Sequence, residues 1–232
     1  MLSNGDLTSP LGSNALVTNL GNFRRDPAAT GLSEIGVHFA DSSGTISTTS
    51  GTLSFLSGRT ATLTNSTLEV NANGTLQFGG DTTIAGATTV AGSSVATVRF
   101  GGSNAEVALT GALQNEFDAA DAPSVVFAGE KFSGGTLNLQ AGEGFFHASG
   151  NLGVEGLVTN RGRYQWQGGA ITGMGLVNEN SVAGQTVFST TTDKIVGGSA
   201  VNNMGHITQT GNIRLDADGK VINSIGATYL LQ

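Results

Sequence analysis

The sequence predicts an all-β fold, a right-handed parallel β-helix (β-solenoid) of about ten rungs of roughly 20–23 residues each. A short motif repeats: Gly51–Phe55 (GTLSF) returns as Gly74–Phe78 (GTLQF), and looser copies end at Phe100 and Phe127. Short stretches rich in Thr, Val, Leu and Ile alternate apolar and polar side chains, which is the period of a strand with one buried face. Glycine and asparagine separate these stretches, as expected at the corners of stacked coils.

The first part of the chain is the least regular, and we expect residues 1–43 to form an irregular or capping region that contains a first rung. Leu16–Phe23 (LVTNLGNF) carries a rung motif that reappears at Leu157–Tyr164. Residues 24–31 are polar, contain Pro and Gly, and indicate a loop, whereas Leu32–Ala40 fits either a strand or a short capping helix. A cap is expected because the open end of a solenoid exposes unpaired backbone groups and core side chains.

A continuous solenoid is expected over residues 44–232. Strand-like alternation begins near Gly44, and Gly-Gly pairs mark corners where the backbone bends or takes a positive φ. The spacing of the motif phenylalanines predicts an aromatic stack inside the core, formed by Phe55, Phe78, Phe100 and Phe127. A spacing of about 20 residues, or its double, predicts that the stack continues through Phe146, Trp166, Phe188 and Tyr229.

One enlarged loop is expected at residues 114–123, because the step from Phe100 to Phe127 is longer than its neighbours. Extra length on one rung is where solenoids place recognition. The loop holds the densest group of acids in the chain around one aromatic ring, and its candidate ligand-binding residues are Glu116, Phe117, Asp118 and Asp121. A solvated loop explains the same residues, and a calcium site is a further alternative, because acid-rich turns supply oxygen ligands.

Asparagine recurs at turns in the C-terminal third of the chain. The spacing predicts equivalent corners, with a structural ladder of stacked amides at Asn160, Asn180, Asn203 and Asn223. Stacked amide side chains hydrogen-bond along the axis of cross-β assemblies, and the same arrangement suits a solenoid corner.

The segment Asn160–Gly175 (NRGRYQWQGGAITGMG) follows the pattern N-x-G-x-aromatic-x-W-x-G-G-x-I-x-G-x-G. This pattern resembles the repeats of filamentous-haemagglutinin-like and autotransporter-passenger-like β-solenoids of large bacterial surface proteins. The resemblance is good over the C-terminal third and looser over residues 44–156. It implies a secreted or cell-surface parallel β-helix and an internal passenger segment of a longer chain, more than any one activity.

Composition excludes several classes of function. The net charge is −7, and the ten Lys and Arg residues are scattered, so nucleic-acid binding is not expected. Cysteine is absent, which excludes disulfides, thiol catalysis and thiolate metal sites. No apolar stretch approaches the ~20 residues that span a bilayer. Met1–Asp6 lacks the basic start and apolar run of a secretory signal, so we expect either a removed signal or a segment of a longer chain.

Catalytic and metal-binding patterns are weak. Glycoside hydrolysis needs two carboxylates about 5–10 Å apart, and whether Asp81 and Glu106 share a face depends on strand register. The three histidines are far apart in sequence, so no zinc site is expected. Residues 216–219 fit an Asp-Gly turn or, alternatively, a calcium site. Tyr164 and Trp166 fit either core packing or sugar stacking, since both face one side of a strand.

We therefore expect a non-enzymatic rod or stalk segment of a secreted or cell-surface bacterial adhesin, matrix or fibre protein, without a cofactor. Its expected partners are neighbouring rungs or segments of a longer chain, a second copy bound end to end, and host or matrix carbohydrate or protein. The alternative is a carbohydrate-binding or carbohydrate-cleaving β-helix of the spike or lyase type. A convergent groove of carboxylates would favour the alternative, whereas uniform Thr, Ser and Asn faces favour the rod.

Overall fold

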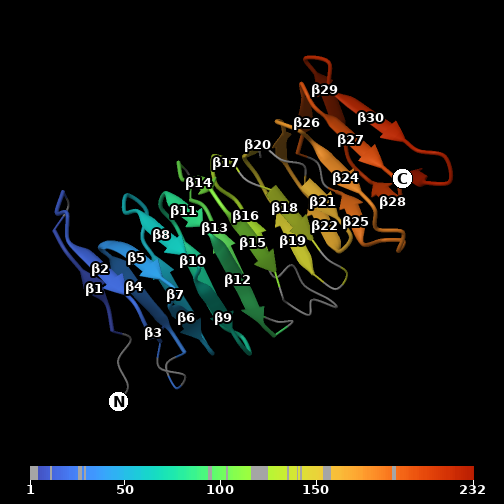
Figure 1. Cartoon of the computed structure of the whole chain (residues 1–232). Coiled ribbons are helices and arrows are strands. Elements are labelled where there is room, and N and C mark those ends of the chain that lie inside the picture. The colour runs from blue at the N-terminus through green and yellow to red at the C-terminus, as the bar shows by residue number, and fades with distance from the viewer. Residues whose placement is uncertain are drawn as a thin grey trace.

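The computed structural model describes residues 5–232 except 11, 26–27, 29, 94–95, 103, 116–124, 135, 140, 142, 154–157 and 190–191. The described residues form 31 short strands and no helix (Figure 1). All the strands lie in three parallel sheets, so the all-β parallel solenoid predicted from the sequence is confirmed.

Successive strands join sheets A, B and C in turn, and three strands with their corners make one rung. Sheet A contains β1 (Leu7–Thr8), β4 (Leu32–Gly36), β7 (Thr52–Phe55), β10 (Thr75–Phe78), β13 (Thr97–Phe100), β16 (Val125–Phe127), β19 (Gly144–His147), β22 (Arg163–Trp166), β25 (Thr186–Phe188), β28 (His206–Gln209) and β31 (Thr228–Leu231). Sheet B contains β2 (Leu16–Asn19), β5 (His38–Ser42), β8 (Ala61–Thr64), β11 (Thr82–Ala85), β14 (Glu106–Leu109), β17 (Lys131–Ser133), β20 (Asn151–Gly153), β23 (Gly169–Ile171), β26 (Lys194–Gly197) and β29 (Ile213–Asp216). Sheet C contains β3 (Asn22–Arg24), β6 (Thr45–Thr48), β9 (Thr67–Val70), β12 (Ala87–Gly92), β15 (Ala112–Asn115), β18 (Thr136–Leu139), β21 (Val158–Asn160), β24 (Leu176–Asn178), β27 (Ala200–Asn203) and β30 (Lys220–Asn223).

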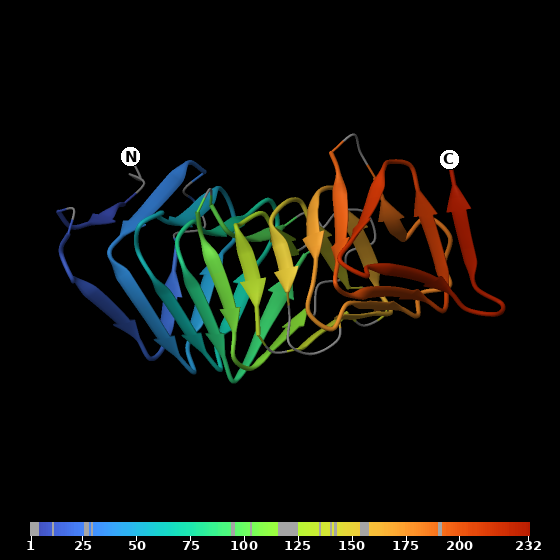
Figure 2. The ribbon, with the colours of Figure 1, turned by 90° about the horizontal axis from the view of Figure 1, so that it is seen from above.

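The stack is elongated, with the two chain ends at opposite ends of the solenoid (Figure 2). Sheet A has 11 strands, and sheets B and C have ten each. At ~4.8 Å between neighbouring strands, sheet A extends about 48 Å along the axis.

The rungs begin earlier than the boundary at residue 44 that the sequence suggested. β2 pairs with β5, and β3 pairs with β6, so residues before 44 already belong to all three sheets. Leu32–Ala40 contributes two strands rather than a capping helix. Ile35 and Phe39 are buried, and the strand period of two brings their side chains into the core.

The phenylalanine stack lies on the inner face of sheet A. Phe55 and Phe78 stack with ring centroids 4.8 Å apart, and Phe78 and Phe100 stack at 5.2 Å. Phe127 occupies the next position of the same column, is fully buried, and packs its ring edge-on against Phe132. Because the four rings occupy equivalent positions on successive rungs, they form one continuous column in the core.

The aromatic column continues differently from the expectation for Phe146. Register places His147, and not Phe146, after Phe127 in this column. Phe145 is buried in the neighbouring inner column, where it pairs with Tyr164, and Phe146 between them faces outward. A slip of one residue reverses the side of a strand on which a side chain lies, and an approximate repeat length cannot resolve one residue. Trp166 and Phe188 are fully buried in the column that starts from the phenylalanines, as expected.

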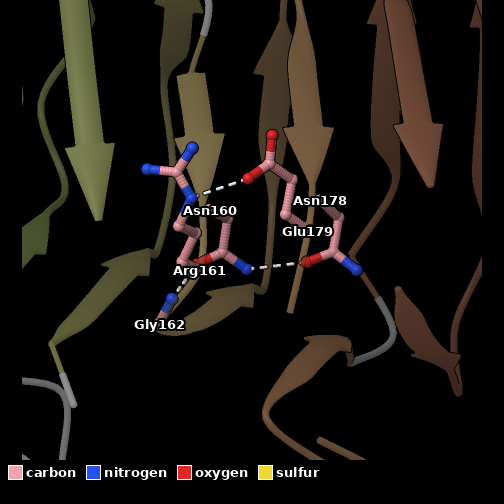
Figure 3. Close-up of polar contacts among 5 residues, drawn as sticks. All are labelled: Asn160, Arg161, Gly162, Asn178 and Glu179. Atoms are coloured by element: carbon pink, nitrogen blue, oxygen red, sulfur yellow. Dashed lines mark hydrogen bonds and ion pairs between the residues drawn. The ribbon is translucent and has the colours of Figure 1, made fainter. Parts of the chain in front are cut away.

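An amide ladder runs through the last positions of the C-terminal strands of sheet C. Asn160 Nδ2 donates to Asn178 Oδ1 at 2.9 Å (Figure 3). Asn178 Nδ2 donates to Asn203 Oδ1 at 2.9 Å, and Asn203 Nδ2 donates to Asn223 Oδ1 at 2.8 Å. The first three amides are fully buried, and each one supplies a hydrogen-bond partner to the next rung.

The ladder contains Asn178 and not Asn180, so the predicted ladder was wrong at this rung. Asn180 lies at the corner beyond β24, where its Nδ2 donates to Gln185 Oε1 and Gly162 O. The ladder steps are 18, 25 and 20 residues, because corner lengths differ between rungs. Even spacing in sequence therefore selected the wrong member of the Asn178-Glu179-Asn180 triplet.

Replacing Asn178 with alanine should lower the free energy of unfolding by about 1–3 kcal/mol, because Asn160 and Asn203 would lose buried partners. Thermal and urea unfolding of Asn178→Ala measure this loss. The matched control is Asn202→Ala, a half-exposed position on the outer side of β27, which should change stability by less than ~0.5 kcal/mol. Equal effects of the two substitutions would contradict a stabilising ladder.

Candidate functional site

A column of polar side chains runs along the corner between sheets A and B. Parallel register aligns His38, Thr60, Asp81, Glu106 and Lys131 on successive rungs. The last four of these side chains are exposed. The register that the sequence left open therefore brings Asp81 and Glu106 to adjacent rungs on one outer surface.

Side-chain hydrogen bonds connect two pairs of neighbouring rungs along this column. Thr60 N donates to His38 Nδ1 at 3.1 Å, and Thr60 Oγ1 lies 2.8 Å from the same nitrogen. Glu106 N donates to Asp81 Oδ1 at 3.0 Å. One oxygen of Asp81 thus holds the next strand in place, and the carboxylate stays at the surface beside Glu106.

A hollow of about 380 Å³ opens at the same corner. Its polar lining comes from Ser57, Arg59 and Thr60 on one rung, Asp81 on the next rung, and Asn104 on the rung after that. Hydroxyl, amide and carboxylate groups on the wall of one hollow can donate to and accept from a ligand rich in hydroxyl groups.

Glycine makes this hollow, and a buried arginine supports it. A Cβ on Gly80 would lie 1.9 Å from Arg59 O, so only glycine fits at this rung. Arg59 is 8% exposed, and its guanidinium donates to Ser13 O at 2.7 Å and Pro10 O at 2.9 Å. The arginine therefore ties the N-terminal segment to the corner, and it lines the hollow together with Asp81.

Other buried cations also bond to backbone carbonyl groups at corners. Arg25 Nη2 donates to Gly31 O at 2.7 Å, and Lys194 Nζ donates to Ser189 O at 3.1 Å. Burial lowers the pKa of Lys194 from its ordinary value. These side chains close corners of the solenoid, because carbonyl oxygens take up their donors.

The predicted ligand-binding residues Glu116, Phe117, Asp118 and Asp121 lie outside the described residues. β15 continues through Asn115, so the first two residues of the predicted loop 114–123 belong to sheet C. The hollow at Asp81 was not predicted. Its only sequence signal is the stacking of glycine-rich corners around residues 58, 79–80 and 101–102.

Tyr164 and Trp166 belong to the core and are both fully buried. His147 stacks on Trp166 with ring centroids 6.0 Å apart, donates from Nε2 to Gly150 O, and accepts from the Tyr164 hydroxyl at Nδ1. Burial lowers the pKa of His147 to about 4, because water no longer solvates the charged ring. The imidazole is therefore a neutral member of the aromatic column.

Among the residues that the structure describes, no three His, Cys, Asp or Glu side chains are grouped to hold a metal ion. At the turn 216–219, the Asp216 carboxylate accepts from Arg214 Nη2 at 2.7 Å. None of the described segments forms a helix with the length and apolar character to cross a bilayer.

Comparisons of the chain with protein-family models, with curated proteins and with solved structures give no match. The parallel β-solenoid architecture rests on the strand register alone.

Acidification should destabilise the protein through His147. Its pKa is lowered in the folded state, so the unfolded chain binds a proton first as the pH falls below about 6.5, and stability is lost down to about pH 4. The loss between pH 7 and pH 4.5 should be about 2 kcal/mol. Urea unfolding at the two pH values measures it.

The matched variant combines His147→Phe with Tyr164→Phe, which keeps the aromatic column and leaves no orphaned hydroxyl. This variant should lack the His147 contribution to the pH dependence. The same loss of stability in the variant and the parent chain would assign the effect to other groups.

Proposed function

We propose that this chain is a non-enzymatic rod segment of a secreted or cell-surface bacterial adhesin, matrix or fibre protein. The observation that carries the proposal is one continuous core across all the described rungs. Each rung pairs with its neighbours in three sheets, so bending requires the distortion of hydrogen bonds and packing together. Such a stack suits a spacer that holds other parts of a protein at a set distance.

The outer surface of sheet B supports this role. Its second outward column carries mostly small side chains, including Thr18, Thr62, Thr83, Ser133 and Thr172. Such faces are polar and offer few of the Trp, Tyr and Arg anchors that dominate binding energy. This column of sheet B therefore offers few side chains that could anchor a partner.

The repeat pattern of Asn160–Gly175 supports the placement of the chain among filamentous-haemagglutinin-like and autotransporter-passenger-like solenoids. The pattern's residues have clear structural uses here. Asn160 starts the amide ladder, Trp166 fills the core, and a Cβ on Gly169 would lie 2.0 Å from Gly150 O. Because a rung needs these residue types, they can recur in any such solenoid for structural reasons. The structural uses therefore do not bear on location, and the proposed cell-surface location rests on the resemblance.

A carbohydrate-binding function is the second candidate, and the hollow at Asp81 favours it. The lining of Ser57, Thr60, Asp81 and Asn104 matches the hydrogen-bonding groups of a neutral sugar. Asp81 Oδ1 already accepts from the Glu106 backbone, so this carboxylate is suited to binding more than to proton transfer.

Rigidity is tested with spin labels, since the chain has no natural cysteine. Thr18 and Asp216 share one outward column across the ten strands of sheet B, so labels at Thr18→Cys and Asp216→Cys should lie about 43 Å apart. The control pair, Thr18→Cys and Ser133→Cys, spans five strand spacings and should give about 24 Å. Pulsed electron–electron double resonance should give a narrow distance distribution for each pair, and the two mean distances should have the ratio of these two values. Broad distributions, or a shortened long distance, would contradict a stiff rod.

Sugar binding is tested with a panel of neutral oligosaccharides and isothermal calorimetry. Any oligosaccharide that occupies the hollow should bind about tenfold or more weakly to Asp81→Asn, which still accepts from Glu106 N but has lost its charge. The control Glu69→Ala removes an exposed carboxylate from the outer side of sheet C and should leave binding unchanged. Equal affinity for Asp81→Asn would place the sugar elsewhere, and an absence of binding across the panel would reject this second candidate.

A further inference from the structure

We propose that the hollow at Asp81 selects, among carbohydrates, a sugar that carries a primary ammonium group, that is, an amino sugar. This inference rests on the carbohydrate-binding function given above as the second candidate, and it names the class of sugar. The evidence is which groups on the wall of the hollow can still accept a hydrogen bond, how these groups lie relative to one another, and where the nearest positive charge points.

The hollow forms where a short corner lies between two longer corners. The corner between β10 and β11 has three residues, 79–81, whereas the equivalent corners of the preceding and following rungs, 56–60 and 101–105, have five each. The longer corners are therefore the walls, and Gly79 and Gly80 lie between them. The volume of about 380 Å³ is at the lower end of the range of small-molecule sites and suits a ligand of the size of a disaccharide.

Thr60 presents an acceptor to the hollow. Its backbone N–H donates to His38 Nδ1 at 3.1 Å, so this nitrogen carries no hydrogen atom. Thr60 Oγ1 lies 2.8 Å from the same nitrogen, and the hydroxyl hydrogen therefore points to His38. Since that hydrogen is used within the protein, the lone pairs of Oγ1 are what the side chain offers to a ligand.

Asp81 supplies a second acceptor, and it is charged. Its Oδ1 accepts from Glu106 N at 3.0 Å, and no described residue donates to its Oδ2. Ala61 N donates to Asp81 O at 2.9 Å, so Thr60 and Asp81 are register neighbours about 4.8 Å apart. Two acceptors that bind one tetrahedral ammonium group at about 2.8 Å lie about 4.6 Å from each other. Thr60 and Asp81 are therefore placed to share one ammonium group.

A backbone carbonyl group adds a third acceptor. Arg59 O faces Gly80, where a Cβ would lie 1.9 Å from this oxygen. None of the described N–H or O–H groups donates to Arg59 O. An ammonium group has three N–H donors, and Thr60, Asp81 and the Arg59 carbonyl group offer three acceptors at one wall. A sugar hydroxyl has one hydrogen and no charge, so it would satisfy fewer of them.

The guanidinium group of Arg59 points away from this position. It donates to Ser13 O at 2.7 Å and to Pro10 O at 2.9 Å, which lie toward the N-terminal end of the solenoid. Asp81 lies on the next rung in the opposite direction. No ion pair within the described part of the chain includes Asp81. Its carboxylate is therefore free of a cationic partner.

The remaining polar lining suits the hydroxyl groups of the same sugar. Ser57 and Asn104 line the hollow from the two longer corners. Each of their side chains can both donate and accept. An ammonium group bound at Thr60 and Asp81 would thus leave the ring hydroxyls beside groups with both functions. An amino sugar combines these two requirements, whereas a neutral sugar meets only the second.

The experiment compares three β-1,4-linked disaccharides that differ only in the group at carbon 2 of each ring. They are the glucosamine disaccharide, its N-acetylated form and cellobiose, which carry an amine, an amide and a hydroxyl group. Isothermal calorimetry at pH 7, where an amine of this kind is largely protonated, measures each affinity. The amine should bind about tenfold or more tightly than the other two, because its hydrogen bonds are charge-assisted.

Asp81→Asn should remove this preference. Asparagine still accepts from Glu106 N but has no charge, so the ratio of the affinities for the amine and cellobiose should fall to about twofold or less. Thr60→Val removes an acceptor and keeps the charge, and it should lower the ratio about threefold. The matched control Glu69→Gln removes a carboxylate from the exposed outer side of sheet C and should leave the ratio unchanged. Circular dichroism confirms that the variants fold.

Three results would overturn the proposal. Equal affinity of the parent chain for the amine and cellobiose would reject ammonium selection and leave the carbohydrate-binding function in place. An equal loss of the preference in Asp81→Asn and Glu69→Gln would show general attraction to a chain of net charge −7 rather than a site. An absence of binding of all three disaccharides would reject the inference, and the panel of neutral oligosaccharides would then decide the carbohydrate-binding function separately.

Discussion

The parallel hydrogen-bonding register between successive rungs is the constraint on which the rest of the structure depends. Each rung takes its position from the strands of the previous rung in three sheets, and equivalent side chains therefore fall at one strand spacing. This spacing allows phenylalanine rings to stack and amides to bond along the axis. A residue type that packs well on one rung can then be repeated on the next rung, because the equivalent residues of adjacent rungs are nearest neighbours.

The same constraint determines how polar groups survive inside the solenoid. Asn178 and His147 are buried, yet each finds partners on the neighbouring rung or corner. Arg59 and Lys194 bring charge to corners where carbonyl oxygens converge. Asp41 departs from this rule among the described residues, since it is 1% exposed and its Oδ2 has no hydrogen-bond partner. Its Oδ1 accepts from Asn19, so the pair is an acid–amide version of the ladder near the N-terminal end.

Function in such a molecule concentrates where the repetition stops. The outward column of sheet B that contains Thr18 and Thr62 repeats small side chains, and this repetition leaves few features that a partner can distinguish. The glycine-rich corner at Asp81 departs from this uniformity through its hollow.

The sequence by itself determined the architecture, because a repeated motif with a strand period of two is compatible with few folds other than a parallel stack. It also identified the aligned rings of Phe55, Phe78 and Phe100. Only the tertiary structure decided between Asn178 and Asn180, between Phe146 and His147, and whether Asp81 adjoins Glu106. The physical reason is that corner lengths vary from rung to rung, so spacing along the sequence does not determine which residues align. At Phe146 a slip of one residue also transfers the side chain to the opposite face of its strand. Pairing between rungs removes this ambiguity, and no pattern along a single chain segment contains that pairing.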